Sequence, residues 1–369
     1  MKHVDEYRNP AVARRLLADI RAQAKEPVRI MEFCGGHTHA IMRYGLRQAL
    51  APQVRMLSGP GCPVCVTANV DIDRAIALAH LPDVTVATFG DMIRVPGSKM
   101  SLQDARAEGA AVRVVYSALD ALALARQQPG RKIVMLGIGF ETTAPTIAAS
   151  LKQAQQEGLD NYFVYSMHKL TPPAMRGILD AGEVHLDAVL GPGHVTAIIG
   201  WRAWEFLPRD YGIPCAVSGC EPLDMLQAIQ LLVQARMEGR ADVANPYARG
   251  VTAEGNRVAR ALMDEVFEPA TAEWRGLGAI PQSGLALRAA YAAHDARLAF
   301  ELPDDAILAE GAAEPRGCRC GEVLRGLVEP PACALFGRAC TPARPVGPCM
   351  VSAEGSCAAY YRYGGHPKP

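Results

Sequence analysis

Two short motifs in the first fifth of the chain combine cysteine, histidine and glycine in a way that suits metal or thiol chemistry. The first is Cys34-Gly-Gly-His-Thr-His39, and the second is Gly59-Pro-Gly-Cys-Pro-Val-Cys65. A C-x-x-C pair either cycles between dithiol and disulfide or binds a soft metal, and the pattern alone leaves both open. Cys34 precedes a predicted helix, whose N-terminus would favour the thiolate, the form that acts as nucleophile and metal ligand.

Further cysteines crowd into the C-terminal tail, at Cys318, Cys320, Cys333, Cys340, Cys349 and Cys357. Four thiolates drawn from loops can hold a [4Fe-4S] cluster, which tolerates varied spacings. Structural zinc sites favour two closely spaced C-x2-4-C pairs, and here only Cys318 and Cys320 lie close in sequence. The spacing therefore favours an iron-sulfur cluster over zinc, with Cys320 and Cys349 as spare thiols.

The composition describes a globular chain without a net charge. Half of the 369 residues are hydrophobic, and 38 Lys plus Arg balance 38 Asp plus Glu. No positive field therefore draws the chain to nucleic acid or to an anionic membrane. The charged N-terminus lacks a signal-peptide core, and the apolar runs are far shorter than the roughly 20 residues that span a bilayer. We expect a cytoplasmic protein, whose eleven cysteines stay reduced and serve metal or redox chemistry.

Short apolar runs alternate with helix-like segments through the first two thirds of the chain, the pattern of βα repeats. Their lack of polar alternation predicts strands buried on both faces of parallel sheets. The runs span residues 28–33, 54–58, 84–89, 112–117, 132–137, 162–166, 186–190 and 215–218.

These elements predict an α/β fold with two similar parallel-sheet, Rossmann-like domains facing a cleft, plus a smaller, mostly helical and loop domain. A Pro-Gly break near residues 127–131 divides the eight strands into two groups of four. We therefore predict one α/β domain over residues 27–130 and a second over 131–238. Residues 239–369, together with the N-terminal helix of 1–26, are predicted to form the [4Fe-4S] cluster domain.

Reactive residues follow most of the predicted strands, and in parallel sheets these carboxyl ends line the ligand site. Beside the two cysteine motifs, the cleft candidates are Asp91, Glu141 and His194. Glu141 is equally compatible with a helix-cap carboxylate. His37 and His39 are two positions apart on a predicted helix, so they do not share a face or a metal. Cys215 and Cys220 flank a short strand, and we expect both to be bystanders.

Taken together, the motifs resemble those of the HypD family of hydrogenase maturation factors along essentially the full length. The resemblance rests on the two cysteine motifs, Gly139-Phe-Glu-Thr-Thr143, Gly191-Pro-Gly-His-Val195 and the cysteine-rich tail. It implies a scaffold on which the Fe(CN)2CO unit of [NiFe] hydrogenases is assembled, in complex with the small chaperone HypC and with cyanide delivered by HypE.

By the same resemblance, roles fall on particular residues. Cys34, Cys62 and Cys65 would bind the mononuclear iron or carry thiol redox chemistry, and Cys318, Cys333, Cys340 and Cys357 would hold the [4Fe-4S] cluster. The cleft positions that match the family are His37, Asp91, Glu141 and His194. The sequence does not decide whether such a scaffold is an enzyme, because it would bind, reduce and hand on iron without releasing a small product.

Two other classes compete with this interpretation. A thiol-disulfide oxidoreductase would pass electrons from a cluster to Cys62 and Cys65 and reduce a partner protein. A zinc-stabilised interaction protein would be colourless and would contain no acid-labile sulfide.

Overall fold

The computed structural model describes residues 5–302 and 314–365, and its strands form two parallel sheets and one antiparallel hairpin. Parts of the predicted terminal domain, residues 1–4, 303–313 and 366–369, lie outside the described residues. The first sheet has the order β2-β1-β7-β8-β9. Its strands are β1 (Val28–Glu32), β2 (Val54–Ser58), β7 (Ala188–Pro192), β8 (Cys215–Ser218) and β9 (Val243–Ala244).

The second sheet has the order β4-β3-β5-β6, again with all neighbours parallel. Its strands are β3 (Val84–Thr88), β4 (Val112–Val114), β5 (Lys132–Gly137) and β6 (Tyr162–Ser166). Every residue of β3 and β6 is buried, as expected for strands covered on both faces by helices. The eight predicted strands and the two parallel sheets are therefore confirmed.

The division of these strands between the sheets differs from the predicted one. β1 pairs with β2 and β7, so residues 28–58 and 188–244 share one sheet, while the other is formed within residues 84–166. The chain crosses between the two units three times, after β2, after β6 and after β9, and no boundary falls near residue 130. A hydrophobic run identifies a buried strand but does not indicate which sheet that strand joins. Strands that are consecutive in sequence are neighbours in a sheet only about two thirds of the time.

The N-terminal helix also lies elsewhere than predicted. α1 (Pro10–Gln23) packs on α12 (Pro222–Met237). Its Ile20 is fully buried in the hydrophobic core that side chains of β1 and α12 also form. It therefore covers the first sheet and does not join the cysteine-rich region. Other elements of this unit are the 3-10 helices η1 (Asp5–Arg8) and η3 (Trp201–Trp204), and the helices α2 (Gly35–Arg43), α3 (Leu46–Leu50), α9 (Thr171–Asp180), α10 (Gly193–Ile199) and α11 (Phe206–Tyr211).

The segment after α12 completes the second unit, where a mostly helical cluster domain was expected. The predicted helix near residues 256–267 is present as α13 (Arg257–Val266), which packs on α8 (Ala144–Glu157). An unpredicted hairpin follows, β10 (Phe267–Trp274) and β11 (Gly278–Leu287). The remaining elements of the unit are α5 (Asn69–His80), η2 (Met92–Arg94), α6 (Leu102–Ala107), α7 (Ala118–Gln127), η4 (Ala289–His294) and α14 (Ala296–Ala299).

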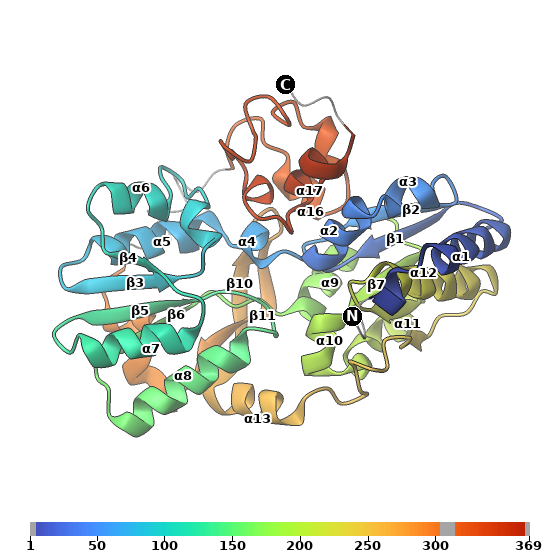
Figure 1. The fold of residues 1–369 in the computed structure, drawn as a ribbon. Coiled ribbons are helices and arrows are strands. Elements are labelled where there is room, and N and C mark those ends of the chain that lie inside the picture. The colour runs from blue at the N-terminus through green and yellow to red at the C-terminus, as the bar shows by residue number, and fades with distance from the viewer. Residues whose placement is uncertain (1–4, 303–313, 366–369) are drawn as a thin grey trace.

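Residues 314–365 form a small lobe, which we call the cysteine lobe, that bridges the two units. Figure 1 shows it in red above α2 and α4 (Pro63–Val66), between the two sheets. α17 (Ser356–Tyr363) packs on α2, and η6 (Pro348–Met350) packs on α4. Its other elements are α16 (Cys320–Leu324) and η5 (Pro330–Ala332). Over the described ranges, no helix is both long and apolar enough to cross a membrane.

Candidate functional site

Cys34 lies where the loop after β1 is pressed against the loop after β2. It forms the N-cap of α2, and the next residue, Gly35, donates its backbone N–H to the carbonyl of Gly61 at 2.8 Å. A Cβ atom on Gly61 would lie 2.3 Å from the Cys34 nitrogen, so only glycine fits. The two predicted cysteine motifs therefore meet, because β1 and β2 are neighbours with parallel carboxyl ends.

The surroundings of Cys34 favour its thiolate. A hydrogen bond from the Cys220 thiol lowers the pKa of Cys34, burial opposes this, and the backbone N–H groups of His37 and Gly36 lower the pKa further. These N–H groups belong to the first turn of α2, whose dipole also favours a negative charge. The predicted position of this thiol at a helix N-terminus is confirmed.

Cys220 is not the bystander that the sequence suggested. Its sulfur, the Cys34 sulfur and a ring nitrogen of His37 all lie within 4.8 Å of one another, the single such three-ligand group among the described residues. His37 is fully buried and its Nε2 lies 3.0 Å from the Ser218 carbonyl. Burial lowers the pKa of His37 to about 4, so the ring is neutral at pH 7.

Cys62 and Cys65 occupy the start of α4 and are almost fully buried. The backbone N–H of Cys65 donates to the Cys62 sulfur at 3.3 Å. Burial raises the pKa of Cys65, but hydrogen bonds from Cys349 and Cys62, together with the charge of Arg275, outweigh it and lower the pKa overall. Burial raises the pKa of Cys62, so Cys65 is the more acidic thiol of the pair. Their sulfurs do not form a compact three-ligand group with Cys34 in the described part of the chain.

The four predicted cluster ligands line one cavity in the cysteine lobe: Cys318, Cys333, Cys340 and Cys357. The lining also includes Cys320 and Cys349, and otherwise mainly apolar side chains, so thiols dominate the potential ligands. A Cβ on Gly347 would lie 2.7 Å from the Cys318 sulfur, and the Val346 N–H donates to the Cys340 sulfur at 3.3 Å. Such N–H···S contacts are typical of cluster-binding thiolates. The residues present therefore fit a [4Fe-4S] cluster.

The two remaining thiols of the lobe, set aside as spare, form a pair. The sulfurs of Cys320 and Cys349 are 2.7 Å apart, and both residues are almost fully buried. Cys349 also makes side-chain hydrogen bonds to Cys357, on the cavity, and to Cys65, at the base of α4. A continuous series of thiols thus links the cavity to the C-x-x-C pair. The sequence gives no signal for this, because the two cysteines lie far apart along the tail.

The other predicted cleft residues are dispersed. Asp91 is exposed after β3 and lies 3.9 Å from Arg94. His194 is exposed after β7, close enough to His37 to lower the pKa of that ring. Glu141 is buried, and it accepts hydrogen bonds from the backbone and hydroxyl of Thr171, at the start of α9. This is the helix-cap arrangement, and burial raises the pKa of Glu141 to about 7.

Two carboxylates that sequence reasoning missed adjoin Cys34. Glu32 is buried at the end of β1 and accepts hydrogen bonds from the Cys34 N–H, at 3.0 Å, and from the Thr38 hydroxyl. Burial raises the pKa of Glu32 despite these bonds. Glu354 reaches across from the cysteine lobe, and a Cβ on Gly35 would lie 2.6 Å from it. The first glycine of the Gly-Gly pair therefore gives the lobe its close approach to Cys34.

Comparison with known proteins agrees with this arrangement. The sequence model of the HypD family, described as Hydrogenase formation hypA family, matches residues 11–364. The chain belongs to the HypD family. It is 48% identical to the Hydrogenase maturation factor HypD of Rhodobacter capsulatus, with 99% of each chain covered. It is 50% identical to that of Azotobacter vinelandii (99% of this chain and 97% of the relative) and 43% identical to that of Escherichia coli K12 (98% of each). The resemblance in the motifs is confirmed.

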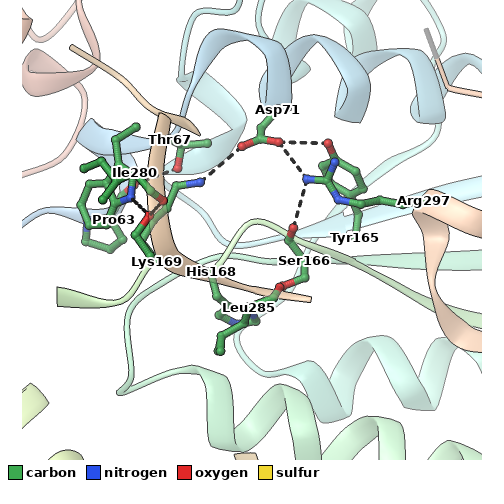
Figure 2. Close-up of polar contacts among 12 residues, drawn as sticks. Pro63, Thr67, Asp71, Tyr165, Ser166, His168, Lys169, Ile280, Leu285 and Arg297 are labelled. Atoms are coloured by element: carbon green, nitrogen blue, oxygen red, sulfur yellow. Dashed lines mark hydrogen bonds and ion pairs between the residues drawn. The ribbon is translucent and has the colours of Figure 1, made fainter. Parts of the chain in front are cut away.

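Another feature of this HypD-family chain is a buried ionic network beside the C-x-x-C helix. Figure 2 shows Lys169, Arg297 and Tyr165 converging on the carboxylate of Asp71, at 3.4, 3.1 and 3.0 Å. Asp71 lies on α5, just after α4, whereas Lys169 follows β6. Lys169 and Asp71 are both buried. The network thus fixes the helix after the C-x-x-C pair to the second sheet.

Replacing Lys169 with methionine should destabilise the protein by about 3 kcal/mol, because Asp71 would lose one of its buried charge partners. This is the lower end of the range for a broken buried ion pair, since Arg297 and Tyr165 remain. Equilibrium urea unfolding would measure the change. Lys152→Met, which breaks an exposed pair with Glu265, is the matched control and should cost less than about 1 kcal/mol. Equal effects of the two substitutions would contradict the assignment.

Proposed function

We propose that this chain is a maturation factor for [NiFe] hydrogenases and the scaffold on which their Fe(CN)2CO unit is assembled. In this proposal it acts in complex with a HypC-type chaperone and receives cyanide through a HypE-type donor. Membership of the HypD family supports the general role. The observation that carries the specific role is the Cys34 thiol, which lies partly exposed at the meeting point of both motifs and whose pKa is lowered by the hydrogen bond from Cys220. Eleven free thiols fit the reducing cytoplasm.

Cys34 is suited to hold iron that carries cyanide and carbon monoxide. Such iron is soft, and thiolate is the soft ligand that proteins offer. The thiol of Cys220 and the first N–H groups of α2 stabilise the negative charge on the sulfur before iron arrives. Because Cys34 and Cys220 are partly exposed whereas Cys62 and Cys65 are buried, incoming iron meets Cys34 first.

The cysteine lobe would hold a [4Fe-4S] cluster on Cys318, Cys333, Cys340 and Cys357. When bound, such a cluster supplies single electrons. The chain's own dithiols, Cys320 with Cys349 and Cys62 with Cys65, can each release two electrons and two protons on forming a disulfide. Cys349 donates a hydrogen bond to the Cys65 sulfur, which places these two pairs in contact.

The series of thiols between the lobe and α4 also supports a second candidate function, an iron-sulfur-linked thiol-disulfide oxidoreductase that reduces a partner protein. This function needs Cys62 and Cys65 but has no use for a Cys34 thiolate. Substitution of Cys34 therefore separates the two candidates.

The deciding experiment is infrared spectroscopy of protein purified without oxygen from cells that also make the HypC-type chaperone. The parent should show cyanide and carbonyl stretching bands, and Cys34→Ala should lose them. Cys215→Ala, which removes a buried thiol of β8, is the matched control and should keep them. If the parent holds a full cluster but shows no such bands, the scaffold is wrong and the oxidoreductase becomes the better account. Colourless protein containing zinc and no sulfide would contradict both.

A further inference from the structure

Cys220 follows β8 and Cys34 follows β1, and both belong to the same parallel sheet. We propose that Cys220 and His37 complete, with Cys34, a three-ligand site that holds the mononuclear iron during assembly. This inference rests on the proposed function and deepens it, because it names the side chains that bind the metal beside Cys34. It also assigns Cys62 and Cys65 to redox chemistry and not to iron binding.

The spacing of the donor atoms suits one metal ion. With metal-ligand bonds of about 2.0–2.3 Å, neighbouring sulfur and nitrogen ligands of a six-coordinate ion lie roughly 2.8–3.3 Å apart. The sulfurs of Cys34 and Cys220 and a ring nitrogen of His37 lie within 4.8 Å of one another. Small side-chain rotations would therefore close the three atoms around an ion.

The ring of His37 is prepared to act as a ligand. Since Nε2 lies 3.0 Å from the Ser218 carbonyl, which only accepts, Nε2 carries the proton and Nδ1 the lone pair. Nδ1 is buried and has no hydrogen-bond partner among the residues that the structure describes. A metal-binding histidine almost always donates its other N–H to a carbonyl or carboxylate in this way. The Ser218 carbonyl thus orients the His37 ring so that Nδ1 can bind a metal ion.

The second glycine of the Gly-Gly pair provides the space. A Cβ on Gly36 would lie 2.9 Å from the Cys220 sulfur and 3.5 Å from the Cys34 sulfur. Any side chain here would therefore occupy the region between the two thiols. The glycine keeps that region open, as expected if an ion enters it.

The number of ligands matches the cargo. Three protein ligands on one side of a six-coordinate iron leave three open positions, as in other non-haem iron sites. The two cyanides and one carbon monoxide of the Fe(CN)2CO unit fill three positions. Cys34 and Cys220 are both partly exposed, so these small ligands can reach the metal from solvent.

A test that does not depend on hydrogenase activity uses Co²⁺ as the probe, added without oxygen to the cluster-loaded full chain. Thiolate-to-cobalt charge-transfer absorption reports the number of bound sulfurs. Cys220→Ala alone should lose about half of the absorption that is lost by the double variant, in which both Cys34 and Cys220 are replaced by alanine. It should also weaken Co²⁺ binding at least about tenfold. His37→Gln should weaken binding without lowering the absorption per bound ion, because it removes no sulfur. Cys215→Ala should match the parent.

Cys220→Ser preserves the side-chain volume and guards against a folding artefact, which circular dichroism would reveal. It should weaken Co²⁺ binding like the alanine variant while remaining folded. Parent-like affinity and absorption in both Cys220 variants would overturn the inference and leave Cys220 as a hydrogen-bond donor that positions Cys34. Infrared spectra keep the two proposals apart: cyanide and carbonyl bands that persist unshifted in Cys220→Ser reject only this inference, whereas their absence from the parent rejects the proposed function.

Discussion

Replacing Cys340 with alanine is expected to remove the [4Fe-4S] cluster from the protein purified without oxygen. The cluster needs four cysteine thiolates, and Cys340 is one of the four proposed ligands that line the cavity. Its sulfur is already oriented by the Val346 N–H at 3.3 Å. The expected result is loss of the brown colour, with iron and acid-labile sulfide falling from about four per chain in the parent to near zero.

Two controls make this result specific to the ligand set. Cys215→Ala removes a buried thiol of β8 and should retain the full cluster. Cys349→Ala removes a thiol that also lines the cavity but pairs with Cys320, so it should retain the cluster while breaking the dithiol. If Cys349→Ala loses the cluster and Cys340→Ala keeps it, the assignment of ligands and redox pair is reversed.

Eight of the parallel strands of this protein could be predicted from the sequence, whereas their pairing could not. Continuous apolar runs such as Tyr162–Ser166 identify strands buried on both faces, because only a covered parallel strand excludes polar residues from both sides. Beside β2, β1 pairs with β7, more than a hundred residues further along the chain. The pairing of β1 with β7 depends on how the intervening unit packs, and no local sequence pattern predicts that packing.

The same distinction applies to the site. Cys34 and Cys62 could be recognised because glycine and a second reactive residue accompany each of them in the sequence. Cys220 lies between Gly219 and Glu221 but has no second cysteine or histidine beside it. Its partners Cys34 and His37 reach it only through the sheet order. The Cys320 and Cys349 pair arises in the same way, from the fold of the lobe. Residues that act through a distant partner were therefore the ones missed.

Gly61→Ala adds only one methyl group, but we expect it to disrupt the site severely. The added Cβ would lie 2.3 Å from the nitrogen and 2.5 Å from the Cα of Cys34, so backbone and not a flexible side chain would have to move. We expect a loss of about 3 kcal/mol in stability, at the upper end for overpacking. The displaced Cys34 should slow accumulation of the infrared cyanide and carbonyl bands by about 100-fold, the effect of a misplacement near 1 Å.

Gly90→Ala is the matched control, because Gly90 also follows a parallel strand but its Cβ would meet nothing closer than 3.9 Å. It should leave urea unfolding and the infrared bands as in the parent. A Gly61→Ala protein with parent-like stability and bands would show that the loops after β1 and β2 separate without loss. Cys34 would then not depend on the second motif for its position. The close backbone contact seen here predicts the opposite: the two motifs act as one unit, because Gly61 is the surface against which Cys34 is held.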